Sequence, residues 1–273
     1  MELFHMKNIS ETLKRALILL LAFFLFTLCI KTIGVRTVVP AYVVDDEAAS
    51  EAEIVDREAD DETSFSLGFA GLNVKLQHLL GYHHSLETLT KLLGYAALLI
   101  VAAFGCLGLS QLVKSKSLRG VDPQIIVLGI YYVIVLVCYF LFEKLIVNYR
   151  PVVLDEGLEA SYPSSHTILV IAVMATMGSQ AVRYVPFLKK NENILNIACY
   201  GIIGIMILFR LLSGVHWFTD IIGGILIALA LVYLYRSACE FFFGSTDSPK
   251  QEEKKITASK PKNPGKRGGA HLA

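Results

Sequence analysis

Charged residues are scarce in this chain. They make up only 18% of the 273 residues, while 54% are hydrophobic; a soluble domain carries about 25% charge. The five cysteines are odd in number and form no CxxC pair, so their spacing indicates neither a metal site nor a disulfide framework. The lack of charge excludes an ordinary soluble domain and indicates a membrane protein.

The apolar residues are gathered into six long runs. A membrane-spanning helix needs about 20 mostly apolar residues, with a range of roughly 17–25. The fourth run is the weakest, because Ser179 and Gln180 interrupt its far end. The sequence therefore predicts an all-α, polytopic membrane protein built as a bundle of six transmembrane helices. The runs are 16–36, 92–113, 124–142, 166–182, 194–212 and 217–235.

The first run has two possible interpretations. Lys7, Lys14 and Arg15 precede it, as basic residues precede both cleaved signal peptides and signal anchors. A small-residue cleavage site does not follow; Lys31 and the segment VVPAY come instead. We therefore expect an uncleaved signal anchor rather than a cleaved signal peptide.

Basic residues in the short loops predict the orientation. With six spans, the basic N-terminus, two basic loops and the basic tail fall on one side, which the positive-inside rule assigns to the cytoplasm. The opposite side receives 37–91, which includes an acidic stretch at 45–62. Both termini are thus expected in the cytoplasm of a cell-membrane protein. The basic loop residues are Lys114, Lys116 and Arg119, then Arg183, Lys189 and Lys190.

The segments around the spans differ in character. Leu72, Leu76 and Leu79 follow helical spacing, which predicts an amphipathic helix at the outer interface. The tail is rich in Pro, Gly, Ser and Lys and is expected to be disordered. Beside a membrane it serves topology or anionic lipid rather than nucleic acid. The predicted divisions are 1–15 (cytoplasmic N-terminus), 16–36 (first span), 37–91 (extracytoplasmic loop), 92–238 (core with five spans) and 239–273 (tail).

Three histidines in the extracytoplasmic loop region raise the question of a metal site. His78, His83 and His84 lie close together in the sequence. They lack a partnering carboxylate or a cysteine pattern, so a wet interfacial surface is the preferred interpretation. We expect no metal in this protein.

Five polar residues stand at the ends of apolar runs. Arg150 follows the third run, His166 opens the fourth and Arg210 is near the end of the fifth. His216 and Asp220 begin the sixth. All five fall on the extracytoplasmic face, and such residues are costly in a membrane unless they have a function. We expect them to meet in one site at the rim of the bundle.

Their chemical types suit phosphoryl transfer. Arg150 and Arg210 are planar cations that match phosphate oxygens. His216 is the candidate nucleophile, and His166 is the candidate general acid for the departing alkoxide. If 216–220 is helical, Asp220 lies on the same face about 6 Å further along. It would then accept the Nδ1 proton of His216 and leave Nε2 free to attack phosphorus.

The segment SYPSSH indicates the start of a helix. Pro163 suits the first turn of a helix, and the turn opens the fourth apolar run. Free N–H groups at Ser164 and Ser165 would face an anion there. Both serines are therefore candidate phosphate-binding residues.

Three segments give the chain a family resemblance: EKLIVNYRP, PSSH and FRLLSGVHWFTD. They resemble KxxxxxxRP, PSGH and SRxxxxxHxxxD, the signatures of the type-2 phosphatidic acid phosphatase superfamily. This superfamily of membrane lipid phosphate phosphatases is related to bacterial acid phosphatases and vanadium haloperoxidases. The resemblance covers roughly 92–238. It implies a six-helix core, a phosphohistidine at His216, leaving-group protonation by His166, and no metal or other cofactor. The phosphate-binding residues that it implies are Arg150, Ser164 and Arg210.

The chain departs from these signatures at three positions. Glu143 stands where the family has its lysine, and Lys144 comes one residue late, about 100° around a continuous helix. Ser165 replaces the glycine of PSGH, and Phe209 replaces the serine of SR. The nucleophile, the acid and both arginines are present, so we expect catalysis to be retained.

These features predict a metal-independent phosphatase acting on a lipid phosphate or pyrophosphate, phospholipid or polyprenyl, at the extracytoplasmic face. Two alternatives stay open. A lipid phosphotransferase would use the same histidine with another acceptor than water. A catalytically inactive lipid-binding or transport component would use none of this chemistry. The motifs report on the phosphate group and leave the lipid and the oligomeric state open.

Overall fold

The protein is described from a computed structural model, which covers residues 10–30, 42–43, 69–153 and 159–244. The predictions for the acidic stretch and for most of the basic tail fall outside these residues. Six helices are long and apolar enough to cross a membrane, and the chain is a multi-pass membrane protein. They are α1 (Glu11–Cys29), α3 (His84–Ser115), α4 (Pro123–Lys144), α5 (Ser165–Tyr184), α7 (Glu192–Leu212) and α8 (Phe218–Phe243).

Shorter elements join these helices. Helix α2 (Ala70–Leu80) lies where the leucine spacing predicted a helix, and η3 (Leu118–Gly120) and α6 (Pro186–Lys189) are loop helices. Strands β1 (Tyr42–Val43) and β2 (Val152–Val153) form a parallel pair. A pair of two-residue strands does not change the class, so the all-α prediction is confirmed.

The helix ends differ somewhat from the predicted runs. Helix α1 begins at Glu11, ahead of the apolar run, because the Ser10 hydroxyl accepts a hydrogen bond from the amide of Leu13 at 3.1 Å and so caps the helix. Helix α3 begins at His84, eight residues before the run at 92–113. Hydropathy detects the apolar part of a helix, whereas capping and polar first turns extend it.

The helices form an inner and an outer set. In their most apolar windows, α5 is 72% buried and α8 is 61% buried, whereas the other four are only 11–28% buried. Helix α5 packs against α3, α4, α7 and α8, and α1 packs along α8. The outer helices expose large apolar side chains such as Leu21, Phe24 and Phe140. Such a surface belongs against lipid.

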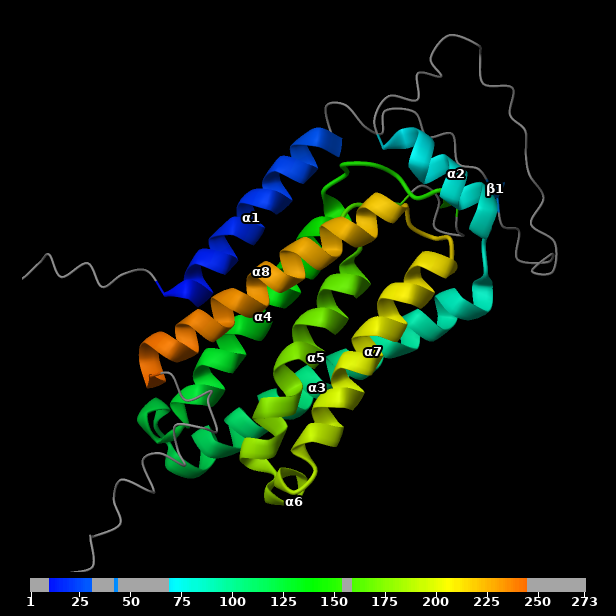
Figure 1. Ribbon diagram of the computed structural model, residues 1–273. Coiled ribbons are helices and arrows are strands. Elements are labelled where there is room, and N and C mark those ends of the chain that lie inside the picture. The colour runs from blue at the N-terminus through cyan, green and yellow to red at the C-terminus, as the bar shows by residue number, and fades with distance from the viewer. Residues whose placement is uncertain (1–9, 31–41, 44–68, 154–158, 245–273) are drawn as a thin grey trace, which may run out of the picture.

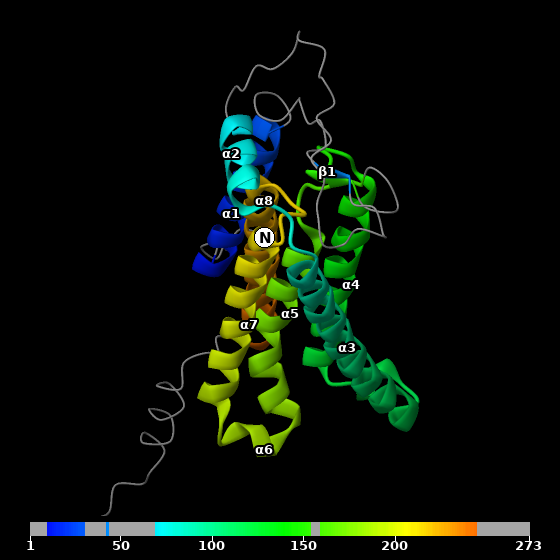
Figure 2. The same cartoon turned by 90° about the vertical axis from the view of Figure 1, so that its right-hand side faces the viewer.

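One end of the bundle gathers the polar segments. Helices α4 and α7 end there, and α5 and α8 begin there, with α2 beside them (Figure 1). Figure 2 shows α2 at this end and α6 at the opposite end. The antiparallel course of the helices therefore brings the loops after α4 and α7 together.

Candidate active site

His216 lies between two charged side chains at this end of the bundle. Its Nδ1 is 3.0 Å from the Oγ of Ser161, and Ser161 donates its hydroxyl proton to the Asp220 carboxylate. His216 is only 3% exposed, and Asp220 is fully buried. Because the serine proton is given to Asp220, its oxygen accepts from the ring, which places a proton on Nδ1 and leaves Nε2 unprotonated.

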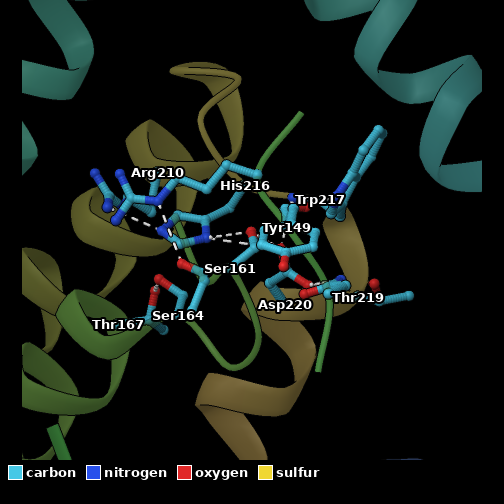
Figure 3. A network of polar contacts seen from close by, with 12 residues as sticks. Tyr149, Ser161, Ser164, Thr167, Arg210, His216, Trp217, Thr219 and Asp220 are labelled. Carbon is cyan, nitrogen blue, oxygen red and sulfur yellow. Dashed lines mark hydrogen bonds and ion pairs between the residues drawn. The ribbon is translucent and has the colours of Figure 1, made fainter. Parts of the chain in front are cut away.

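The structure does not show the direct hydrogen bond that we expected between His216 and Asp220. Nδ1 and the carboxylate Oδ2 are 3.6 Å apart, and Ser161 bridges them (Figure 3). The expectation assumed a helix over 216–220, whereas α8 begins at Phe218. Asp220 is the third residue of that helix, and its carboxylate caps the free amide of Trp217 at 2.9 Å. Capping stops the helix short of His216.

Asp220 is held on every side. Its Oδ1 accepts from the Asn148 amide at 3.0 Å, and its backbone carbonyl accepts from the Ser164 amide at 3.0 Å. The close approach depends on Gly224, where an added Cβ would lie 3.0 Å from the Ser164 carbonyl oxygen. Three separate segments of the chain therefore meet at one carboxylate.

Arg210 approaches the opposite side of His216. It is fully buried in the last turn of α7, and its Nη2 is 2.9 Å from the His216 Nε2. Nη1 donates to the Thr90 hydroxyl of α3 at 3.1 Å. Its Nε has no acceptor among the described residues. A buried guanidinium with an unsatisfied donor beside an unprotonated ring nitrogen suits an anion.

The electrostatics keep His216 neutral. Burial lowers the pKa of His216 well below its usual value, and the positive charges of Arg210 and Arg150 lower it further. Both effects penalise the protonated ring. The imidazole therefore keeps its lone pair at neutral pH.

Arg150 follows α4 in an extended segment. Its Nη1 pairs with the Glu159 carboxylate at 2.8 Å, and its side chain is 8% exposed. Its amide also bonds to the Glu159 carbonyl at 3.1 Å. Arg150 is therefore held by the segment that leads into Ser161 and α5.

The start of α5 brings in the PSSH residues. Ser164 is fully buried, and its hydroxyl accepts from Thr167 at 2.9 Å. The amides of Ser165, His166 and Thr167 have no acceptor among the described residues. The His166 ring packs against Gly94 of α3, where an added Cβ would lie 2.8 Å from its Cδ2. Free amides of this kind favour a bound anion.

The structure shows the surroundings of Glu143 and Lys144, where the chain departs from the first family signature. Glu143, at the family's lysine position, accepts a hydrogen bond from the Ser165 hydroxyl at 3.1 Å. Lys144 is exposed and has no hydrogen bond or ion pair with the described residues. Lys144 therefore does not take over the lysine's position in this structure.

Three partners in the site were missed in the sequence. Ser161 is the first residue of SYPSSH, Asn148 lies within EKLIVNYRP, and Thr90 lies in none of the three signature segments. Each lies at least 55 positions from its partner in the chain. Ser161 and Asn148 therefore have a sequence signal, their places within SYPSSH and EKLIVNYRP, whereas Thr90 has none.

The histidines of the loop before α3 have other partners. His83 Nε2 is 2.9 Å from the Leu80 carbonyl, and His84 Nδ1 is 3.2 Å from the Tyr82 hydroxyl. Within the described ranges, no three His, Cys, Asp or Glu residues form a group that could hold a metal ion. His78, the third of these histidines, is exposed on α2.

Comparison with known proteins assigns the chain to a family. The family model of the PAP2 superfamily matches residues 91–241, more than half of the chain, which therefore belongs to that superfamily. Phosphatidylglycerophosphatase B of Bacillus subtilis (strain 168) is 28% identical over 95 residues, 34% of this chain. That match spans 45% of the relative's length.

A solved structure gives the same architecture. The crystal structure of a transmembrane PAP2-type phosphatidylglycerolphosphate phosphatase from Bacillus subtilis superposes with a TM-score of 0.51 at 18% identity. The superposition covers 84% of this chain and 97% of the other. At this identity the likeness establishes the fold.

Proposed function

We propose that this protein is a membrane phosphatase that hydrolyses a lipid phosphate through a phosphohistidine on His216. The supporting observation is the hydrogen-bonded chain Asp220–Ser161–His216, which leaves Nε2 unprotonated where it accepts a hydrogen bond from Arg210. An anion bound by that guanidinium lies next to the nucleophile. The superfamily membership agrees with this chemistry.

The reaction has two steps. In the first, Nε2 of His216 attacks phosphorus and the bond to the lipid oxygen breaks, while His166 gives its Nε2 proton to that oxygen. In the second, water attacks phosphorus, His166 takes a proton from the water, and the nitrogen–phosphorus bond breaks. Neutral His216 and inorganic phosphate result.

The charge of the transition state is met by the protein itself. Arg210 and Arg150 supply two permanent cations, and the free amides at the start of α5 supply dipoles. Together these donors stabilise charge on the equatorial oxygens. We therefore propose a metal-independent mechanism.

The site is proposed to face the extracytoplasmic side of the cell membrane, with both termini in the cytoplasm. The basic loops between α3 and α4, and between α5 and α7, support this orientation. They lie at the bundle end opposite the site. Helix α2 would then lie at the outer interface, beside the head group of a lipid in the outer leaflet.

The substrate class is a lipid carrying a terminal phosphate or pyrophosphate. Phosphatidylglycerophosphate is the first candidate, because both similar proteins are named for it. Polyprenyl pyrophosphate and phosphatidic acid share the phosphate that the site recognises. No described contact distinguishes their tails.

The test is phosphate release from these three lipids in detergent. Wild type is expected to release phosphate from at least one of them, and His216→Ala none above background, with the helical fold retained by circular dichroism. Release from no lipid by wild type would support the inactive binder. Transfer of labelled phosphate to an added acceptor lipid in preference to water would support the phosphotransferase.

A further inference from the structure

Two departures from the family signatures touch each other. The Oγ of Ser165, which replaces a glycine, donates to Oε1 of Glu143, which replaces the lysine, at 3.1 Å. The same Oγ is 3.5 Å from Nδ1 of His166. Glu143 belongs to the last turn of α4, and Ser165 is the first residue of α5. The two changes therefore form one contact behind the candidate general acid.

We propose that Glu143 and Ser165 are positioning residues for His166, and that they act as a linked pair. This proposal rests on the proposed function, in which His166 protonates the leaving lipid oxygen. The chain would then hold each of its two site histidines by a serine that is bonded to a carboxylate. The Ser165 hydroxyl is engaged by Glu143 and His166 in this arrangement.

The assignment of protons on Ser165 and His166 supports a positioning role for Glu143 and Ser165. A serine hydroxyl has one proton, and here it goes to Glu143, so the oxygen accepts from Nδ1–H of His166. Nε2 then carries the proton that is transferred to the lipid oxygen. After the transfer Nδ1–H stays in place, and Nε2 is ready to take a proton from water. The positive charges of Arg210 and Arg150 disfavour the doubly protonated ring that starts this cycle, and a carboxylate on the Nδ1 side opposes their effect.

Helix dipoles explain why the carboxylate is stable there. At the end of α4 a carboxylate opposes the dipole of its own helix. Through Ser165, however, it contacts the beginning of α5, where negative charge is favoured. A lysine at position 143 would be favoured by the α4 dipole and disfavoured at the beginning of α5. The position beside Ser165 therefore favours a carboxylate.

The packing around His166 restricts its ring. Gly94 approaches one edge of the imidazole, and the Tyr139 ring lies edge-on with centroids 5.8 Å apart. These contacts limit the position of the ring, and the Ser165 hydroxyl selects its tautomer. The pair therefore controls which nitrogen holds the proton.

The test compares two substrates with different leaving groups. Glu143→Gln, Ser165→Ala and the double variant are assayed in detergent on dioleoyl phosphatidic acid and on p-nitrophenyl phosphate. We expect each single variant to lose about fivefold in kcat on the lipid, as one hydrogen bond of about 1 kcal/mol predicts. The aryl phosphate, whose leaving group needs no proton, should change less than about twofold on the same scale.

The double variant and a conservative variant at Ser165 distinguish a positioning role of the pair from a packing role. The double variant should lose no more than either single variant, because both break one link. Ser165→Thr keeps the hydroxyl and should lose less turnover on the lipid than Ser165→Ala. Lys144→Gln, at the exposed neighbouring position, is the matched control and should have no effect. Equal losses on both substrates, or losses that multiply in the double variant, would overturn the proposal.

A spectrum separates this proposal from the proposed function. In ¹⁵N-histidine spectra, assigned with His166→Ala and recorded at a pH where the ring is neutral, the His166 Nδ1 should appear protonated in wild type, and Ser165→Ala should show a mixture of tautomers. An unprotonated Nδ1 in wild type would overturn the pair even if the enzyme is active. Absence of phosphate release by wild type would instead overturn the catalytic role, whatever the spectrum shows.

Discussion

The two histidines of the site differ in how firmly their surroundings hold them. His216 is buried and lies 3.0 Å from its serine, whose partner Asp220 is fully buried. His166 is half-buried and lies 3.5 Å from its serine, whose partner Glu143 is exposed. A hydrogen bond in a buried network is stronger, and more costly to break, than one at a wet surface.

This difference matches the demands of the proposed roles. The nucleophile must present one nitrogen to phosphorus in a fixed direction, and small displacements are costly. An acid that serves a lipid oxygen and then a water must meet two positions. The looser hold on His166 agrees with these two tasks.

The largest separation comes from His166→Ala. We expect lipid phosphate turnover to fall by about 10²–10⁴-fold, as loss of a general acid predicts. Turnover of p-nitrophenyl phosphate should fall much less, because its leaving group departs without a proton. Steady-state kinetics on both substrates measures the ratio. Equal losses would mean that His166 is not the acid.

Ser161→Ala tests the more firmly held histidine. We expect about a tenfold loss of kcat on lipid and aryl substrates alike, from one buried bond of roughly 1.5 kcal/mol. The nucleophile serves both substrates, unlike the acid. Asp220→Asn should lower kcat strongly, and the double variant should show coupling with Ser161→Ala. An unimpaired Ser161→Ala enzyme would show that the serine does not orient His216.

Thr90→Val removes the second anchor of Arg210. The hydroxyl accepts from Nη1 at 3.1 Å, so its loss frees the guanidinium from α3. We expect KM to rise about fivefold with kcat little changed, on the scale of one hydrogen bond of about 1 kcal/mol. A fall in kcat at constant KM would instead show that the Thr90 contact helps Arg210 to stabilise the transition state.

The smallest effect is expected from removal of metal ions. Because arginines and backbone amides supply the positive charge, EDTA should leave turnover of both substrates unchanged, and vanadate should inhibit both. Phosphate release after dialysis against chelator measures this. Activity that is lost with EDTA and restored by magnesium would contradict the metal-free mechanism.

Much of the fold followed from the apolar runs. Each of the six runs overlaps a long helix, and the alternation of sides sends the segments around Arg150, His166 and His216 to one end. The sequence-based predictions were wrong where polar contacts determine the helix ends and the partners of side chains. Asp220 caps α8 at Trp217, so the expected helical spacing to His216 did not form. In the sequence, Glu143 was recognised only as a departure from the family's lysine, and its bond to Ser165 was not predicted.

Composition and spacing alone determined the membrane class, the six helices and the residues that share one end of the bundle, because burial in lipid depends on runs of apolar residues and on their number. Only the tertiary structure decided how the histidines are held. Ser161 reaches His216 across 55 positions, and Thr90 reaches Arg210 across 120. Such bonds depend on how separate helices pack to within fractions of an ångström, which no local pattern encodes.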